Sequence, residues 1–138
     1  MVSKKMTQYD AFAFDPPAPV TQVALRNSAT GAVISKVSMQ LDTGADATLV
    51  PRDVVELLGI EVDESYGEEL RGFDNKADFF PKVYLEIVFL RRRFRGYFLI
   101  IPSVNGILGR DILNGFTLIF DGKSLSWSEI VSEDTKTM

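Results

Sequence analysis

Hydrophobic and polar residues alternate along two neighbouring stretches in the first third of the chain, residues 20–26 and residues 32–41. Side chains on a strand point to opposite faces in turn, so this alternation indicates strands with one buried face. A glycine-containing polar segment lies between the two stretches. The pattern therefore predicts a β-hairpin whose second strand ends where Asp42 begins a tight turn. Its buried face carries Val37, Met39 and Leu41.

The rest of the chain predicts further strands with short helices between them, and hence an all-β fold with one or two short helices. Pro51 suits the first position of a short helix that Gly59 ends. Two strands joined by a long polar turn are expected over residues 68–89. The other expected elements are a strand over 94–101, a helix over Arg110–Leu113 and a closing hairpin over 116–127. Strand, glycine turn and short helix thus occur twice, which indicates a duplicated motif.

The two ends of the chain differ from the middle in composition. Residues 1–19 are polar and then proline-rich, so we expect a partly ordered, extended N-terminal arm. Phe12 and Phe14 lie at strand spacing in this arm, and we expect them to pack on their own domain or on a second subunit. Residues 20–129 form the expected folded domain, and residues 130–138 an expected frayed tail.

The composition limits the chemistry available to the protein. A chain of 138 residues is long enough for one domain with a proper core, and it contains neither cysteine nor histidine. Thiol nucleophiles, the commonest catalytic base and the commonest metal ligand are therefore missing. His-assisted serine hydrolases, cysteine proteases and His-ligated zinc hydrolases are excluded, which leaves carboxylates. We expect no cofactor and no metal.

The charge pattern bears on possible partners. The net charge of −4 argues against general nucleic-acid binding, although residues 91–95 form a basic cluster around one phenylalanine. A solvated turn between two apolar strands is favoured there over a phosphate-binding patch. No apolar run approaches the ~20 residues of a membrane span, and no signal-like apolar region follows the N-terminal lysines. We expect a soluble, cytoplasmic protein without membrane contact.

Asp42 lies at the start of the turn that follows the second predicted strand. Thr43 supplies a hydroxyl beside the carboxylate, and Gly44 lets the backbone bend without a Cβ. Asp-Thr-Gly by itself could be an ordinary turn. Its position after a strand, its Ala-Asp continuation and a counterpart late in the chain make it a candidate working acid.

Two stretches carry a family resemblance: residues 41–49, Leu-Asp-Thr-Gly-Ala-Asp-Ala-Thr-Leu, and residues 107–111, Ile-Leu-Gly-Arg-Asp. In this order they resemble the motifs of the retropepsin-like aspartic proteases, the single-domain family that includes retroviral proteases and their cellular relatives. The resemblance covers residues 20–120. It implies a closed, barrel-like β fold with one lobe per chain, and a flap hairpin over the cleft.

The resemblance also implies roles for residues of both stretches. Asp42 would be the catalytic acid, Thr43 would lock two active-site turns together, and Gly44 would bond the substrate backbone. Asp46 would line the cleft together with Ala45. Arg110 would pair with Asp46 behind the site.

Other substrate contacts are implied by the same resemblance. Ile107 and Leu49 would form walls of the side-chain pockets, although both could equally be core residues. Residues 70–80 stand in the flap's place, and the tip carries the sequence Gly72, Phe73 and Asp74. Retroviral flaps are richer in glycine at the tip, and this more acidic tip would narrow specificity.

Peptide hydrolysis by this chemistry needs two carboxylates about 3 Å apart that share one proton. The second stretch has glycine and apolar residues where a second Asp-Thr-Gly would be, and no other aspartate precedes Ser/Thr-Gly. The resemblance thus implies a homodimer that joins two copies of Asp42 on a two-fold axis. Such a pair releases its protons in two coupled steps, so we expect cleavage to favour mildly acidic pH.

The prediction is an aspartic endopeptidase that acts on a peptide or protein substrate. An alternative of a different class is a catalytically silent, dimeric peptide-binding or scaffolding module with the same fold, which the unusual flap favours. A carboxylate glycosidase also uses paired acids, but a domain of this length has little room for a sugar cleft.

Overall fold

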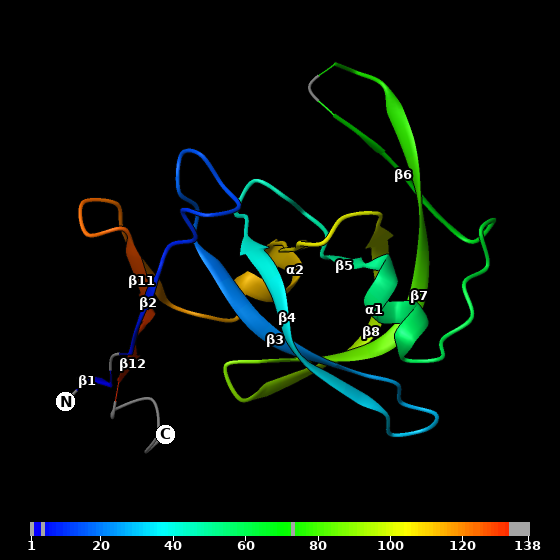
Figure 1. Ribbon diagram of the computed structural model, residues 1–138, viewed down its shortest axis with the longest axis horizontal. Helices are drawn as coiled ribbons and strands as arrows, with labels where there is room; N and C mark the ends of the chain where they lie inside the picture. Colours follow the sequence, from blue (N-terminus) through cyan, green and yellow to red (C-terminus); the bar gives the residue numbers. More distant parts are fainter. Residues whose placement is uncertain (1, 4, 73, 133–138) are drawn as a thin grey trace.

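The computed structural model describes residues 2–3, 5–72 and 74–132 of the chain (Figure 1). Strands make up most of the ordered structure of these described residues, which also contain two short helices. The mostly β fold predicted from the alternating pattern is therefore confirmed.

The main sheet has seven strands, and an additional pairing of β3 with β7 closes six of them into a barrel. Strands β4 and β9 run parallel, as do β5 and β8, whereas the other pairs in the sheet are antiparallel. In sheet order the strands are β3 (Val20–Arg26), β4 (Val33–Leu41), β9 (Gly106–Leu108), β5 (Leu49–Pro51), β8 (Arg92–Ile101), β7 (Ala77–Phe89) and β6 (Gly67–Arg71).

The interior of the barrel is filled by the apolar face of each strand. Met39 and Leu108, on the paired strands β4 and β9, have no exposed surface. Leu85 and Ile87 of β7 are equally buried and lie two residues apart, as one face of a strand requires. The expected buried face of the second predicted strand, which includes Met39, is therefore confirmed.

Helices α1 (Arg52–Leu57) and α2 (Arg110–Leu113) each bury one side against the barrel, through Val55 and Ile112 respectively. Pro51 is not the first helical residue, because it ends β5 and caps α1 in an extended conformation. Gly59 follows α1 with a φ of 74°, a left-handed conformation that glycine adopts without strain. Its expected role in ending the helix agrees with this geometry.

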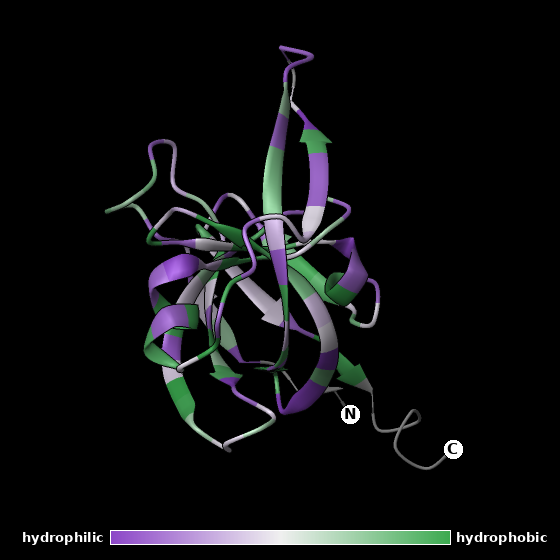
Figure 2. Cartoon of the chain, turned by 90° about the vertical axis from the view of Figure 1, so that its right-hand side faces the viewer, coloured by the Kyte–Doolittle hydropathy of each residue, from purple (hydrophilic) through white to green (hydrophobic). Residues whose placement is uncertain are grey.

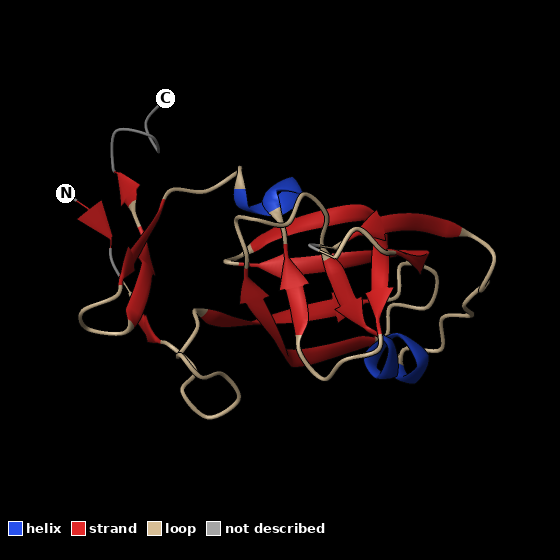
Figure 3. Ribbon diagram, turned by 90° about the horizontal axis from the view of Figure 1, so that it is seen from above, coloured by secondary structure: helices blue, strands red, loops and turns tan. Residues whose placement is uncertain are grey.

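A smaller sheet lies beside one end of the barrel (Figure 3). It contains β10 (Leu118–Asp121), β11 (Ser126–Glu129) and β2 (Met6–Gln8). The Trp127 indole Nε1 donates a hydrogen bond of 3.1 Å to the carbonyl oxygen of Val20, so this sheet is tied to the first barrel strand. The closing hairpin predicted near the C-terminus is present.

The ends of the chain are more ordered than their composition predicts. Strand β1 (Val2–Ser3) pairs with β12 (Val131–Ser132), so part of the expected frayed tail is a strand. The polar composition predicts a frayed end there, because pairing with a distant segment leaves no local pattern in the sequence. Residues 133–138 lie outside the described part of the chain.

The N-terminal arm packs on its own domain through Tyr9 rather than through both phenylalanines. Asp10 and Ala18 form an antiparallel bridge that closes the proline-rich loop. Phe12 projects from this loop and is fully exposed, whereas Phe14 is half-buried. Phe12 therefore does not pack on its own domain, and the other expected arrangement, packing on a second subunit, stays a prediction.

The β6–β7 hairpin stands out from the barrel and carries polar residues at its tip (Figure 2). Gly67 begins β6 where the two strands approach so closely that a Cβ would clash with the carbonyl oxygen of Phe80. Among the described residues, no helix has the length and apolar character needed to cross a bilayer.

Candidate active site

Asp42 is the first residue after β4, at the end of the barrel. Its backbone N–H donates to the carbonyl oxygen of Leu108 at 3.0 Å, which continues the parallel pairing of β4 with β9. The preceding residue, Leu41, donates to the carbonyl oxygen of Pro19 at 2.9 Å. Two different segments therefore fix the backbone that presents the Asp42 carboxylate, which stays partly exposed.

The turn after Asp42 is held by its own carboxylate. The Gly44 N–H donates to Asp42 Oδ1 at 2.9 Å, and the Ala45 N–H donates to the Asp42 carbonyl oxygen at 3.2 Å. A Cβ on Gly44 would lie 3.2 Å from the same Oδ1, so a side chain there would crowd the carboxylate. The second carboxylate oxygen, Oδ2, makes no hydrogen bond within the described part of the chain.

Arg110, the first residue of α2, braces the outer side of this turn. Its backbone N–H donates to the carbonyl oxygen of Ala45 at 2.8 Å, and its Nη1 donates to the carbonyl oxygen of Thr43 at 2.6 Å. The Asp46 carboxylate lies 3.9 Å from Nη2 but is 92% exposed, so this ion pair contributes little. The main contact of Arg110 is thus with the Thr43 backbone rather than with Asp46.

A second link between the two stretches was missed by sequence reasoning. The Thr48 hydroxyl donates to Asp111 Oδ1 at 2.6 Å, and the Thr48 N–H donates to Oδ2 at 3.0 Å. The same hydroxyl accepts a hydrogen bond of 3.0 Å from the Gly109 N–H. Thr48 is 1% exposed, and a polar residue between apolar positions was the available signal of a buried partner.

Gly109 allows the two stretches to touch. A Cβ at this position would lie 2.6 Å from the carbonyl oxygen of Ala47, closer than real contacts allow. The turn before α2 and the turn after β4 therefore pack backbone against backbone. The late glycine turn that the sequence pairs with Asp42 is its direct neighbour in space.

The residues expected to line side-chain pockets lie beside this site. Leu49 of β5 pairs with Ile107 of β9 in an antiparallel register. Leu49 is 5% exposed, whereas Ile107 keeps part of its surface. In a single chain, Ile107 therefore offers more exposed surface to a bound peptide than Leu49 does. That these two residues form pocket walls stays a prediction.

Gly72 and Asp74, two of the expected flap residues, lie at the tip of the β6–β7 hairpin. The tip is closed by hydrogen bonds from Gly72 N–H to the Lys76 carbonyl oxygen, 3.3 Å, and from Asn75 N–H to the Gly72 carbonyl oxygen, 3.0 Å. The Asp74 carboxylate accepts a hydrogen bond of 3.1 Å from the Lys76 N–H, and this bond helps to close the turn. Phe73 lies outside the described residues.

The segment that leads into the hairpin is anchored to α1 by a two-pronged ion pair. Arg52 Nη1 and Nη2 donate to the two carboxylate oxygens of Glu64 at 3.0 and 2.9 Å. This hydrogen bonding to Glu64 raises the pKa of Arg52 above its ordinary value. Nearby, hydrogen bonds from Ser65 lower the pKa of Asp63. Both contacts order the connection between α1 and β6.

Comparison with solved structures places this architecture among known folds. The EIAV protease in complex with the inhibitor HBY-793 is 22% identical, with a TM-score of 0.55 over 71% of this chain and 86% of that chain. A retropepsin-like aspartic protease from Rickettsia conorii is 13% identical, with a TM-score of 0.57 over 96% of this chain and 95% of that chain. The sequence matches no protein-family model and no curated protein.

At these identities the likeness concerns the fold. The chain adopts the retropepsin fold, as the resemblance of residues 41–49 and 107–111 implied. The closed barrel agrees with that expectation, whereas a role of the β6–β7 hairpin as a flap stays a prediction.

Proposed function

We propose that this chain with the retropepsin fold is an aspartic endopeptidase that works as a homodimer, with one Asp42 from each copy. The observation that carries the proposal is the fixed, partly exposed Asp42 carboxylate in an Asp-Thr-Gly turn at the barrel end. The protease neighbours in fold space support the same chemistry.

The proposed reaction uses two carboxylates that share one proton, since like charges at close range cannot both ionise. The ionised carboxylate takes a proton from a water molecule, whose oxygen attacks the carbonyl carbon of the scissile bond. The protonated carboxyl gives its proton to the carbonyl oxygen. Collapse of this intermediate breaks the C–N bond as a proton passes to the leaving nitrogen.

A second copy follows from the count of suitable acids. One chain contains one Asp-Thr-Gly, and the neighbouring turn at Gly109 holds no acid that matches Asp42. A two-fold axis beside the turn would bring two copies of Asp42 together, as an isologous contact does. In this arrangement Thr43 is the residue that meets its own copy across the axis.

Arg110 and Asp111 are positioning residues in this proposal. Arg110 holds the Thr43 carbonyl oxygen, and Asp111 holds Thr48 on the far side of the turn. Both contacts come from α2, so one helix holds both the Asp42 turn and the segment that follows it. The two catalytic carboxylates must be held rigidly, since misplacing a catalytic group by about 1 Å lowers the reaction rate on the order of a hundredfold.

Digestion of an undirected peptide library at several pH values tests the proposal. The wild-type chain should cleave, most rapidly at mildly acidic pH, and Asp42→Asn should fold normally without cleaving. Asp53→Asn changes an exposed aspartate on α1 and is the matched control. Cleavage by Asp42→Asn at the wild-type rate would exclude the proposed catalytic role.

The polar tip of the β6–β7 hairpin favours a second candidate, a silent dimeric module that binds peptides without cutting them. Asp74 is committed to the turn there, and Gly72 is the one glycine between the strands. The library digest separates the candidates, because a silent module would retain peptides by pull-down while leaving every bond intact.

A further inference from the structure

Glu86 of β7 is a completely buried carboxylate that does not point into the core. Its neighbours in sequence, Leu85 and Ile87, belong to the hydrophobic core and are fully buried. Because alternate side chains of a strand face opposite ways, Glu86 lies on the outer face of the barrel. Something other than the core must therefore cover it.

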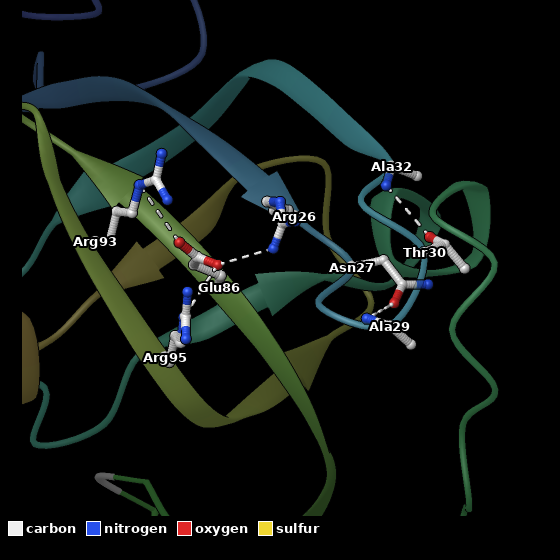
Figure 4. A network of polar contacts seen from close by, with 8 residues as sticks. All are labelled: Arg26, Asn27, Ala29, Thr30, Ala32, Glu86, Arg93 and Arg95. Carbon is white, nitrogen blue, oxygen red and sulfur yellow. Dashed lines mark hydrogen bonds and ion pairs between the residues drawn. The ribbon is translucent and has the colours of Figure 1, made fainter.

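Three arginines from two other strands cover Glu86 (Figure 4). Arg26 of β3 and Arg95 of β8 are its direct cross-strand neighbours. Arg26 Nη1 donates to Oε2 at 3.2 Å, Arg95 Nε lies 3.4 Å from Oε2, and Arg93 Nε lies 3.6 Å from Oε1. Three positive charges thus surround one negative charge.

The excess positive charge of this cluster faces solvent. The side chains of Arg93 and Arg95 are 68% and 61% exposed. Each turns its Nε to Glu86, and in the described part of the chain neither guanidinium group makes a hydrogen bond. Their terminal Nη groups are therefore available to an acceptor from outside, in the forked geometry that suits carboxylates.

Exposed tyrosines continue the same face next to the arginines. Tyr84 and Tyr97 form the next cross-strand pair on β7 and β8, two residues from Glu86 and Arg95, with ring centroids 5.3 Å apart. Tyr66 packs edge-on against Tyr97 at 5.8 Å. All three rings line a cavity of about 660 Å³. Tyrosine and arginine are the residue types that carry most binding energy at protein interfaces.

The strand that carries Arg93, Arg95 and Tyr97 also has an unpaired edge. β8 pairs with β7 over Arg92–Leu99, but it pairs with β5 only over Leu99–Ile101 in the described part of the chain. An extended peptide can add to such an edge, with alternate side chains on one face. The alternate spacing of these three residues matches that period.

We propose that this arginine–tyrosine face, formed by Arg26, Tyr66, Tyr84, Arg93, Arg95 and Tyr97, docks an extended, acidic segment of a polypeptide partner. The partner's carboxylates would bind the free guanidinium groups, and its apolar side chains would enter the tyrosine-lined cavity. A polypeptide is favoured over nucleic acid because the cations form a short row in a chain of net charge −4. The inference does not depend on the proposed catalytic function.

Fluorescence anisotropy with a fluorescein-labelled glutamate–tyrosine copolymer tests this surface. The wild-type chain should bind the copolymer, more weakly as salt rises, and bind labelled poly-lysine and single-stranded DNA less. Replacing Arg93→Gln and Arg95→Gln together should weaken binding at least about tenfold. The control is Lys5→Gln with Lys123→Gln, which removes the same charge from exposed positions outside this face and should change binding little.

Two further variants keep the test decisive if loss of both arginines unfolds the chain. Replacing Arg93→Lys and Arg95→Lys together preserves the positive charge beside Glu86 but removes the forked donor pair of each guanidinium group. This variant should weaken copolymer binding by a smaller factor than the Arg93→Gln/Arg95→Gln variant does. Tyr97→Ser removes a ring from the same face without touching Glu86 and should weaken copolymer binding. Three results would overturn the proposal. They are absence of binding by the wild-type chain, equal binding by the Arg93→Gln/Arg95→Gln variant and the Lys5→Gln/Lys123→Gln control, and tighter binding of DNA than of the copolymer.

Discussion

Thr48 and Asp111 are joined by two hydrogen bonds, of 2.6 Å from the threonine hydroxyl and 3.0 Å from its backbone N–H. The two residues are 63 positions apart, and they connect the segment after the Asp42 turn to the helix that braces it. The hydroxyl also accepts from the Gly109 N–H. One buried side chain, that of Thr48, therefore links the two stretches of the candidate active site by hydrogen bonds.

Thr48→Val should destabilise the fold by about 1–3 kcal/mol, because it leaves the Gly109 N–H and an Asp111 oxygen without a partner while preserving shape. Urea denaturation followed by circular dichroism measures the change in the free energy of unfolding. Thr117→Val alters an exposed threonine and is the control. Equal stability of the two variants would show that the buried hydrogen bonds contribute nothing net.

Gly109→Ala should be far more harmful than Gly96→Ala. A Cβ on Gly109 would lie 2.6 Å from the carbonyl oxygen of Ala47, whereas nothing lies within 4 Å of a Cβ on Gly96. We expect Gly109→Ala to cost more than about 3 kcal/mol of unfolding free energy, and Gly96→Ala to stay within about 1 kcal/mol of wild type. Thermal and urea unfolding of both variants provide the comparison, and similar losses would contradict the close approach.

Ser65→Ala should raise the pKa of Asp63 toward its ordinary value of 3.8. In the folded chain the Ser65 hydroxyl and N–H donate to Asp63 Oδ1 at 2.6 and 3.0 Å, which lowers this pKa. Asp63 therefore stabilises the fold above its unfolded pKa, and that contribution is lost as pH falls through the lowered folded pKa. NMR titration of the Asp63 carboxyl carbon measures the shift, and an unchanged titration in the variant would exclude this cause.

Dilution should reduce cleavage per chain if each active site contains Asp42 from two copies. Specific activity should fall steeply once the concentration drops below the dimer dissociation constant, because separated copies hold one carboxylate each. Analytical ultracentrifugation across the same concentrations gives the dimer fraction for comparison. Constant specific activity in a sample shown to be monomeric would contradict the two-copy mechanism.

The sequence predicted most of the strands and the Asp42 turn because both leave local patterns. Period-two alternation identified the strand that ends at Asp42, and glycine marked the turns. Glu86 could not be placed in this way, since its burial depends on arginines of two other strands. The basic composition of residues 91–95 likewise predicts a solvated turn, because nothing local shows that these arginines contact a buried carboxylate. The turn is centred on Leu90 and Arg91, and the residues that follow belong to β8.

The site was predicted as two stretches, but the contacts between them were not. The expected partner of Arg110 was Asp46, whereas its shorter bond is to the Thr43 carbonyl oxygen. Backbone acceptors have no sequence signature, because every residue carries one. The Thr48–Asp111 link was missed because a polar residue before a strand suggests a buried partner but does not identify it, and Asp111 lies 63 positions away.

The parallel pairing of β4 with β9 has a consequence for the order in which the protein can assemble. Asp42 lies early in the chain, but the carbonyl oxygen that holds its backbone belongs to Leu108. During synthesis the Asp-Thr-Gly segment therefore leaves the ribosome after Pro19 and β3 but long before β9 and α2 exist. Contacts of such long sequence separation form late and slowly. A nascent or truncated chain that ends before β9 would carry the acid without the mount that positions it.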